Sequence, residues 1–305
     1  MIAAEARAAL EQALGEGVLF DVPMSRHTSL RIGGPADALA TPADRAELIA
    51  LLRICHQHRL ARTLLGSGFN ILVRDAGLDG VVISQKKLRR LEERSGPAVF
   101  AEAGVSHAGV TRFCQQHGFS GMEFAAGIPG TVGGWIAMNA GIGVREQKDV
   151  VVSIEIATAN GGEERTLAGE QLDFRYRELV GLPEGALVLS ALFAVSPSTP
   201  DAVKAEIDRL LGQRSATQPL DVPSCGSVFR NPEGDFAGRL IEAAGLRGER
   251  IGAAQISTQH ANFITNLGGA TAADVLALIE RARERVLERS GIELATEVKI
   301  MGRAT

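Results

Sequence analysis

The apolar residues of this chain follow helical spacing in several segments. Residues 3–14 and 43–58 place apolar side chains three or four positions apart, as on the buried face of a helix. A further helix is predicted from Ser106, which can cap its start, to His117, with Gly118 as terminator. The clearest helix begins at Thr271 with a sequence typical of a capping box, and its predicted buried positions are Val275, Leu278, Ile279, Ala282 and Val286.

Shorter apolar runs between these helices predict strands. They lie at residues 28–35 (broken by a Gly-Gly-Pro turn), 63–65, 71–73, 81–83, 150–158 and 187–195. Apolar positions alternate along residues 292–300, which predicts a strand with Glu297 on the opposite face. Ser196 to Pro200 is the best candidate for a linker to a C-terminal domain. Because helices and strands mix without strict βαβ alternation, the predicted fold class is α+β.

Length and composition agree with a globular protein of more than one domain. At 305 residues the chain exceeds one ordinary domain, and its 45% hydrophobic and 22% charged residues allow a substantial core. The formal net charge of −4 argues against nucleic acid or an anionic membrane as a partner. The 6 histidines have no metal-ligand spacing, so we expect no metal.

The cysteines indicate a reducing compartment. Cys55, Cys114 and Cys225 are odd in number, far apart and outside any Cys-x-x-Cys motif, which favours free thiols over a disulfide framework or a zinc site. The first residues lack the apolar core of a signal peptide, and no apolar stretch reaches the roughly 18 residues of a membrane span. We therefore expect a cytoplasmic protein.

Two glycine-rich loops are the most informative chemical feature. The run from Gly127 to Gly134 is closed by Asn139-Ala-Gly141, and a second loop, Gly66 to Asn70, follows a predicted strand. Backbone N–H groups exposed in such loops form an anion-binding concavity that suits a diphosphate. A buried crossing of two backbones would also require glycine. The third Rossmann glycine is absent and no P-loop motif occurs, so neither standard nucleotide motif applies.

Further motifs complete a pattern along nearly the whole chain. The segments that carry it are Thr28 to Asp37, Leu65 to Val73, Ala126 to Gly134, Met138 to Gly141, Phe174 to Arg177, Pro223 to Pro232, Ala237 to Glu242, His260 to Phe263 and Glu297 to Gly302. With these motifs the chain resembles the UDP-N-acetylenolpyruvoylglucosamine reductase (UDP-N-acetylmuramate dehydrogenase) family, in the shorter of its two types.

The resemblance implies a fold and an activity. Residues 31–196 are expected to form an FAD-binding domain of the vanillyl-alcohol-oxidase (PCMH) type in two α/β subdomains, with residues 1–30 packed on it. Residues 203–305 are expected to form an α+β substrate-binding domain. The implied activity is NADPH-dependent reduction of a UDP-sugar enolpyruvyl ether to UDP-N-acetylmuramate, in peptidoglycan synthesis and hence in cell-wall growth, cell shape and division. FAD is expected to be bound non-covalently, and the enzyme to be a monomer.

The resemblance also assigns residues to the site. The implied cofactor contacts are Gly66, Ser67, Gly68, Asn70, Gly127, Ile128, Pro129, Gly130, Thr131, Gly133, Gly134, Asn139 and Gly141. The implied substrate contacts are Tyr176, Arg214, Gln218 and Asn231. The implied catalytic residues are Arg177, Ser227 and Glu297.

The chemistry of an enolpyruvyl ether explains the catalytic residue types. Hydride addition to its terminal CH₂ carbon builds an enolate on the carboxylate side, which a fixed charge such as Arg177 can stabilise. Ser227 would then give a proton to C2, since an enolate carbon is a strong base. The sequence pattern alone favours a surface salt bridge within the charged run 175–178 for Arg177 and an exposed pair with a lysine for Glu297, and only the resemblance reverses both interpretations.

Two other functions remain open at this stage. One is another flavin oxidoreductase of the same fold, which often attaches its flavin to a histidine or cysteine near the first glycine loop; Gly66 to Asn70 contains neither. The other is a nucleotide-sugar-binding relative without activity. The presence of Arg177, Ser227 and Glu297 together argues against it.

Overall fold

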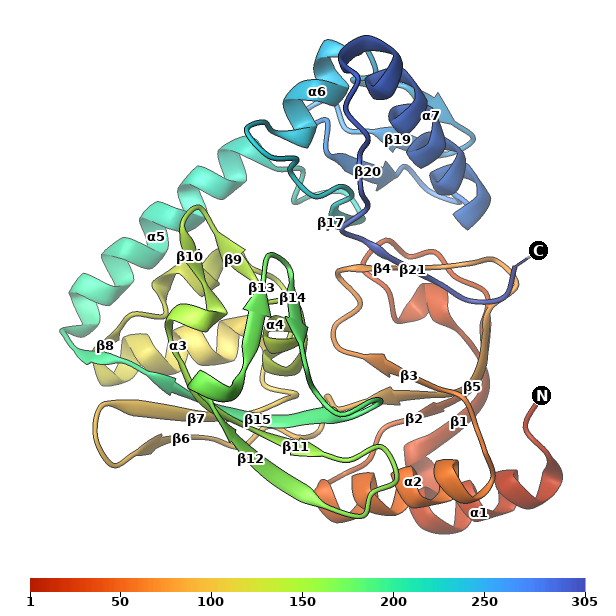
Figure 1. The fold of residues 1–305 in the computed structure, drawn as a ribbon, viewed down its shortest axis with the longest axis vertical. Coiled ribbons are helices and arrows are strands. Elements are labelled where there is room, and N and C mark those ends of the chain that lie inside the picture. The colour runs from red at the N-terminus through yellow and green to blue at the C-terminus, as the bar shows by residue number, and fades with distance from the viewer. Residues whose placement is uncertain (305) are drawn as a thin grey trace. The chain divides into compact units, whose positions relative to one another are not determined.

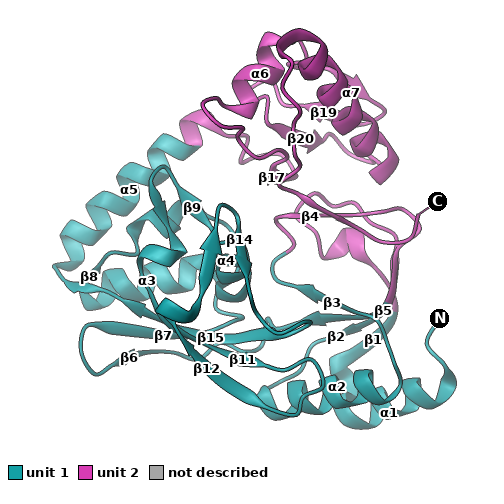
Figure 2. Ribbon diagram, in the orientation of Figure 1, with its two compact units in different colours: residues 1–20, 38–67, 80–214 teal, residues 21–37, 68–79, 215–305 magenta. Residues whose placement is uncertain are grey.

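The computed structural model of the protein describes residues 1–304. The chain folds into two compact units, shown in different colours in Figure 2. Unit 1 comprises residues 1–20, 38–67 and 80–214, and unit 2 comprises residues 21–37, 68–79 and the residues from 215 onward. Three boundaries between the units, after residues 20, 37 and 79, fall within strands. The domain boundaries predicted at residues 31, 196 and 203 stay a prediction.

Unit 1 is built around a five-stranded antiparallel sheet (Figure 1). Its strand order is β12 (Glu164–Ala168), β11 (Val151–Ala157), β15 (Leu187–Ala194), β7 (Ala98–Glu102) and β6 (Leu91–Arg94). Successive side chains of β15 point to opposite faces, so Leu187 and Leu189 join one core while Val188 joins another. This central strand is therefore covered on both sides.

Helices cover the two faces of this sheet. The helices that begin in unit 1 are α1 (Ala4–Leu14), α2 (Arg45–Gln57), α3 (His107–His117), α4 (Val132–Ala137) and α5 (Pro200–Thr217). Apolar residues of α3 and α4 pack in one core with β7, β11 and β15, and those of α1 and α2 pack in the other. Burial of these apolar faces is the main force that holds each helix in place.

A second sheet has four strands. Its order is β1 (Val18–Pro23), β2 (Pro35–Ala40), β5 (Leu78–Ser84) and β3 (Arg62–Leu65), and β3 runs parallel to β5. Three short antiparallel pairs complete unit 1: β8 (Phe119–Ser120) with β16 (Ser196–Pro197), β9 (Gly141–Ile142) with β10 (Arg145–Glu146), and β13 (Asp173–Arg175) with β14 (Glu178–Val180).

Unit 2 has its own core, formed by a sheet and two helices. The sheet order is β17 (Ser224–Ser227), β20 (Phe263–Asn266), β19 (Ala254–Ile256) and β18 (Arg250–Ile251), with helices α6 (Ala237–Ala243) and α7 (Ala272–Ser290). A parallel pair, β4 (Ile71–Val73) with β21 (Lys299–Met301), joins segments from both ends of the chain. Leu30, Ile32 and Leu72 belong to the same core as α6 and α7.

The predicted helices are all present. The Ser106 side chain accepts the amide of Gly109 at the start of α3, and Gly118 ends that helix in the left-handed conformation. In α7, Thr271 and Asp274 form the predicted capping box, and all five predicted inward positions are buried. The α+β fold class is confirmed.

Three local predictions were wrong. Residues 28–34 form no strand, because Thr28 Oγ1 both accepts from the Ile32 amide and donates to the Ile32 carbonyl, which closes a turn. Residues 196–200 are no free linker, since Ser196 and Pro197 pair with β8 and α5 begins at Pro200. Residues 292–298 keep the predicted alternation of burial, but only Lys299–Met301 forms a strand.

The described residues contain no helix that is long and apolar enough to cross a membrane.

Candidate functional site

The two glycine loops meet at Thr131 in unit 1. A Cβ built on Gly66 would lie 2.9 Å from Thr131 Oγ1, and one built on Gly134 would lie 3.8 Å from the same oxygen. Both glycines are exposed, whereas Thr131 itself is buried at 7% exposure. Two bare stretches of backbone thus flank one hydroxyl group. Exposed glycine backbone suits a diphosphate, because its N–H groups can bind an anion and no Cβ is in the way, so the residues fit the diphosphate of FAD.

Other glycines of the second loop are explained by protein packing. A Cβ on Gly127 would lie 2.9 Å from Ile142 Cδ1, and one on Gly133 would lie 3.1 Å from the Ala103 Cβ. The buried crossing considered from sequence therefore accounts for these two positions. The crossing does not account for Gly134, which is exposed and, among the described residues, has only Thr131 Oγ1 within 4 Å of its Cβ position.

Trp135 supports the second loop from inside the core. Its side chain is 1% exposed, and its indole Nε1 donates to the carbonyl of Ile128 at 3.1 Å. The amides of Val132 and Gly133 donate to the carbonyls of Val105 and Ala103 at 3.0 and 2.9 Å. Contacts within the protein therefore fix the loop.

The far end of the first loop lies in unit 2. Gly68 has φ of +71°, and a Cβ there would collide with the His27 carbonyl, so this position requires glycine. The Ser29 amide donates to the Gly68 carbonyl at 3.0 Å, and its hydroxyl lies within hydrogen-bond distance of the carbonyls of both Gly68 and Ser224. Ser29 thereby joins the loop to β17.

Ser227 and Glu297 lie close together in unit 2 although 70 residues separate them. Ser227 ends β17, where Gly226 with φ of +75° interrupts the pairing with β20. The Glu297 amide donates to the carbonyl of Val228, the residue after Ser227, at 2.8 Å. Asn70 Nδ2 donates to the Glu297 carbonyl at 3.2 Å. A predicted cofactor residue, Asn70, and a predicted catalytic residue, Glu297, therefore share one hydrogen-bond network, which reaches the residue after Ser227.

Arg177 lies in unit 1, at the turn between β13 and β14. Its φ is +59°, a left-handed conformation that non-glycine residues seldom adopt. Its Nη1 lies 3.4 Å from Glu146 Oε1, and its Nη2 donates to the Gly141 carbonyl at 3.1 Å. The sequence allowed a surface salt bridge within residues 175–178, but the Arg177 side chain is only 18% exposed and contacts Glu146, 31 residues earlier.

The predicted substrate residues have different surroundings. In unit 1, the Tyr176 ring lies under the Arg177 guanidinium, and the Arg214 side chain lies 3.4 Å from the Cβ position of Gly127. Burial lowers the pKa of Arg214 from its usual value. In unit 2, Asn231 Oδ1 accepts from the Ala237 amide at the start of α6, and Gln218 follows the end of α5.

The contacts of Glu146 with Arg177 and Asn139 were not predicted from the sequence. The resemblance identified Asn139 as a cofactor residue, but the Asn139 side chain is buried, and its Nδ2 donates to Glu146 Oε2 and to the Arg175 carbonyl, both at 3.0 Å. Glu146 is one acid in the polar stretch 143–149, and only its capping-box spacing to Asp149 carried a local signal. Its partner Arg177 is distant in sequence.

The cysteines are not reactive groups. All three are buried and free, and burial raises the pKa of Cys225 to about 12. A thiol with that pKa stays protonated at neutral pH and is a poor nucleophile. Within residues 1–304, no group of three or more His, Cys, Asp or Glu side chains could hold a metal ion.

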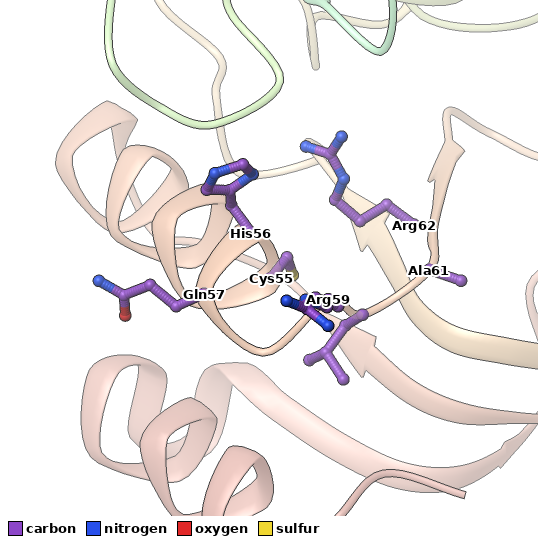
Figure 3. A pocket seen from close by; sticks show the side chains of 7 residues that line it. Cys55, His56, Gln57, Arg59, Ala61 and Arg62 are labelled. Atoms are coloured by element: carbon purple, nitrogen blue, oxygen red, sulfur yellow. The ribbon is translucent and has the colours of Figure 1, made fainter.

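A separate surface pocket of about 700 Å³ lies in unit 1, at the end of α2 and the start of β3. Figure 3 shows its lining, in which His56, Arg59 and Arg62 are the basic groups. None of the predicted site residues lines it. The Arg62 guanidinium donates to the Ala159 carbonyl and so also supports the neighbouring loop.

Comparison with known proteins places the chain in a family. Residues 36–167 match the model of an FAD binding domain, and residues 218–301 match that of the UDP-N-acetylenolpyruvoylglucosamine reductase C-terminal domain. The UDP-N-acetylenolpyruvoylglucosamine reductase of Geobacter metallireducens is 45% identical over 298 residues, which cover 98% of each chain. That of Geobacillus thermodenitrificans is 45% identical over 287 residues, which cover 94% of each chain.

Solved structures agree with these matches. The crystal structure of UDP-N-acetylenolpyruvylglucosamine reductase from Thermus caldophilus superposes with a TM-score of 0.80 at 33% identity, covering 92% of this chain and 98% of that chain. The glucose dehydrogenase Phl p 4.0202 has a TM-score of 0.50 at 11% identity, covering 64% of this chain and 44% of that chain, and so shares the fold alone. The fold and the FAD-binding domain define a flavoenzyme of the PCMH type. The chain belongs to the UDP-N-acetylenolpyruvoylglucosamine reductase family.

The exposed backbone of Gly66 and Gly134 beside the Thr131 hydroxyl, here called the glycine cradle, gives a testable prediction. Gly134→Ala places a methyl group at an ordinary contact distance in the protein, and alanine favours a helix by about 0.5–1 kcal/mol, so the apoprotein should be as stable as the wild type or more stable. The same methyl group projects into the cradle, so the Kd for FAD should rise about tenfold or more. Fluorescence titration of the apoprotein with FAD measures this change.

Gly212→Ala is the matched control, since it makes the same change in α5, where a Cβ would have no neighbour within 4 Å. An unchanged FAD affinity in Gly134→Ala would contradict the placement of the cofactor at Thr131.

Proposed function

We propose that this chain is an NADPH-dependent flavoenzyme that reduces UDP-N-acetylenolpyruvoylglucosamine to UDP-N-acetylmuramate, a peptidoglycan precursor. The observation that carries the proposal is the network in which the Glu297 amide donates to the Val228 carbonyl, beside Ser227, while Asn70 holds the Glu297 carbonyl. Membership of the reductase family over more than nine-tenths of the chain supports the same activity.

The residues that would hold FAD are those around Thr131, together with the first glycine loop. When bound, FAD supplies the hydride that reduces the vinyl carbon of the substrate. Gly66 and Gly134 leave room for the diphosphate beside the Thr131 hydroxyl. The first loop has no histidine or cysteine, and the three thiols are buried, which supports non-covalent binding.

The chain's own residues would handle the charge and the proton. Arg177 would hold the substrate carboxylate and the negative charge that develops on it, because a guanidinium keeps its charge at all working pH values. Glu297 would be the second partner of the developing enolate, and Ser227 would donate a proton to C2. Tyr176, Arg214, Gln218 and Asn231 would contact the UDP-sugar.

The proposal includes a monomeric enzyme in the cytoplasm. The buried free thiols are compatible with a reducing compartment. Light scattering of the purified protein tests the oligomeric state: the mass of one 32.2 kDa chain is expected, and a mass of two chains would contradict it.

Absorption spectroscopy tests the function directly. The purified protein should be yellow, NADPH should bleach it, and the enolpyruvyl ether should restore the colour under anaerobic conditions. Acid precipitation should release all the colour into the supernatant. Bleaching by a hydroxy acid or an alcohol would instead support a different flavin oxidoreductase, and a colourless protein that takes up no FAD would support a binding relative without activity.

The role of Ser227 can be tested by separating the two half-reactions. Ser227→Ala should be bleached by NADPH at the normal rate, because that step needs no acid at the substrate carbon. Reoxidation by the enolpyruvyl ether should slow by at least the factor of about 10²–10⁴ that a general acid contributes. Stopped-flow absorbance measures both steps. Ser227→Cys is the rescue variant, since a thiol can also donate a proton, and equal slowing of both steps would mean that Ser227 is structural.

Arg177 and Glu297, the two proposed partners of the enolate, should affect the chemical step more than binding. Arg177→Lys and Glu297→Gln should each lower kcat by about 10²–10³, as is typical when one stabilising group is removed, with a smaller change in KM. Steady-state kinetics with NADPH and the enolpyruvyl ether measures both constants. Near-normal turnover in both variants would show that the assignment is incorrect.

A further inference from the structure

The Glu146 carboxylate is held from two sides. Its Oε1 lies 3.4 Å from Arg177 Nη1, while its Oε2 accepts from Asn139 Nδ2 and pairs with Lys148 Nζ, both at 3.0 Å. The Glu146 amide donates to Asp149 Oδ2 at 2.8 Å, so the backbone is held by a capping box as well. The side chain is 14% exposed. Glu146 therefore has little freedom to move.

Arg177 depends on this carboxylate and on the backbone beside it. A turn residue with φ of +59° and a long side chain has no orientation fixed by its own backbone, so contacts must fix its guanidinium. Glu146 Oε1 contacts one terminal nitrogen, and the Gly141 carbonyl accepts from the other. Two contacts to a planar group define its plane as well as its position.

Asn139 joins the two parts of this arrangement. It is fully buried, and its Nδ2 donates both to Glu146 and to the carbonyl of Arg175 in the hairpin that carries Arg177. Its Oδ1 accepts from the Lys148 amide at 3.0 Å. The Asn139 side-chain amide thus fixes the Glu146 carboxylate relative to the hairpin, because it bonds both to that carboxylate and to the backbone of the hairpin that carries Arg177.

We propose that Glu146, held by Asn139, is a positioning residue that orients the Arg177 guanidinium for the carboxylate of the substrate. The inference rests on the role of Arg177 in the proposed function. Glu146 acts through geometry rather than through attraction, because its negative charge repels a substrate carboxylate. Lys148, on the other oxygen of Glu146, partly offsets that repulsion.

This mechanism predicts a particular kinetic pattern. Glu146→Ala removes the contact and the repulsion together, so kcat and the rate of reoxidation by the enolpyruvyl ether should fall about 10- to 100-fold, as expected when a reacting group is misplaced by about 1 Å. KM should stay unchanged or decrease. Glu146→Gln keeps an acceptor oxygen and should lose less. Reduction by NADPH should be unchanged in both variants.

A matched control is available in the same unit. Glu163→Gln removes the charge of another Glu–Arg pair, that with Arg165, on an exposed surface. Its kinetics should equal those of the wild type. FAD content and thermal unfolding identify any variant whose fold has changed. If Glu146→Ala is such a variant, the kinetics of Glu146→Gln are compared with those of Glu163→Gln instead.

A double-mutant cycle tests whether Glu146 acts through Arg177. If it does, the combination of Glu146→Ala with Arg177→Lys should lose less activity than the product of the two single effects. Fully multiplicative losses would overturn the proposal, as would an equal slowing of both half-reactions in Glu146→Ala.

A crystal structure of Glu146→Ala with FAD decides the positioning without any substrate. A displaced or disordered Arg177 guanidinium is the expected result, and a guanidinium in its original position would overturn the inference. If the wild-type enzyme is not reoxidised by the enolpyruvyl ether, the proposed function fails, and this structure still decides whether Glu146 positions Arg177.

Discussion

The candidate site depends on close contact between backbone segments that are far apart in the sequence. Gly68 passes so near the His27 carbonyl that a Cβ would collide with it, and Gly66 lies against the Thr131 hydroxyl. Where two segments approach this closely, only glycine fits. Gly68 is buried at such a contact, whereas Gly66 and Gly134 are exposed beside Thr131, where the proposed diphosphate site lies.

Short polar side chains fix these segments once they are in place. Asn262 bonds to both the amide and the carbonyl of Phe229, and Asn266 donates to the Leu30 carbonyl, all among buried groups. Asn70 and Asn139 do the same for the Glu297 carbonyl and for the hairpin of Arg177. A buried amide that satisfies an otherwise unpaired backbone group stabilises the fold because the unpaired group would carry a desolvation penalty. Asn70 and Asn139 thereby hold segments that carry predicted site residues.

Elements with a strong local signal were predicted correctly. Helix α7 has a capping box, a left-handed glycine end and a regular apolar face, and each of these is decided within a few residues. Residues 28–34 were predicted wrongly because the Thr28 side chain closes a local turn that the apolar pattern does not report. Residues 196–200 were predicted wrongly because Ser196 pairs with β8, which is distant in sequence. Burial also alternates along residues 292–298 without a strand, because apolar periodicity reports burial rather than hydrogen bonding.

The sequence by itself determined the α+β class, the helices with complete caps and the glycine loops, and its resemblance to a family supplied the residues proposed for the enolate. The tertiary structure alone decided which glycines serve packing and which leave space beside Thr131. Whether a Cβ would collide at a given glycine depends on the atoms that surround it in the fold. It also decided that Asn139 uses its amide within the protein and that Arg177 pairs with Glu146, 31 residues away. Side-chain contacts across such distances leave no periodic trace in a single sequence, since they depend on how the sheet and its hairpins bring the segments together.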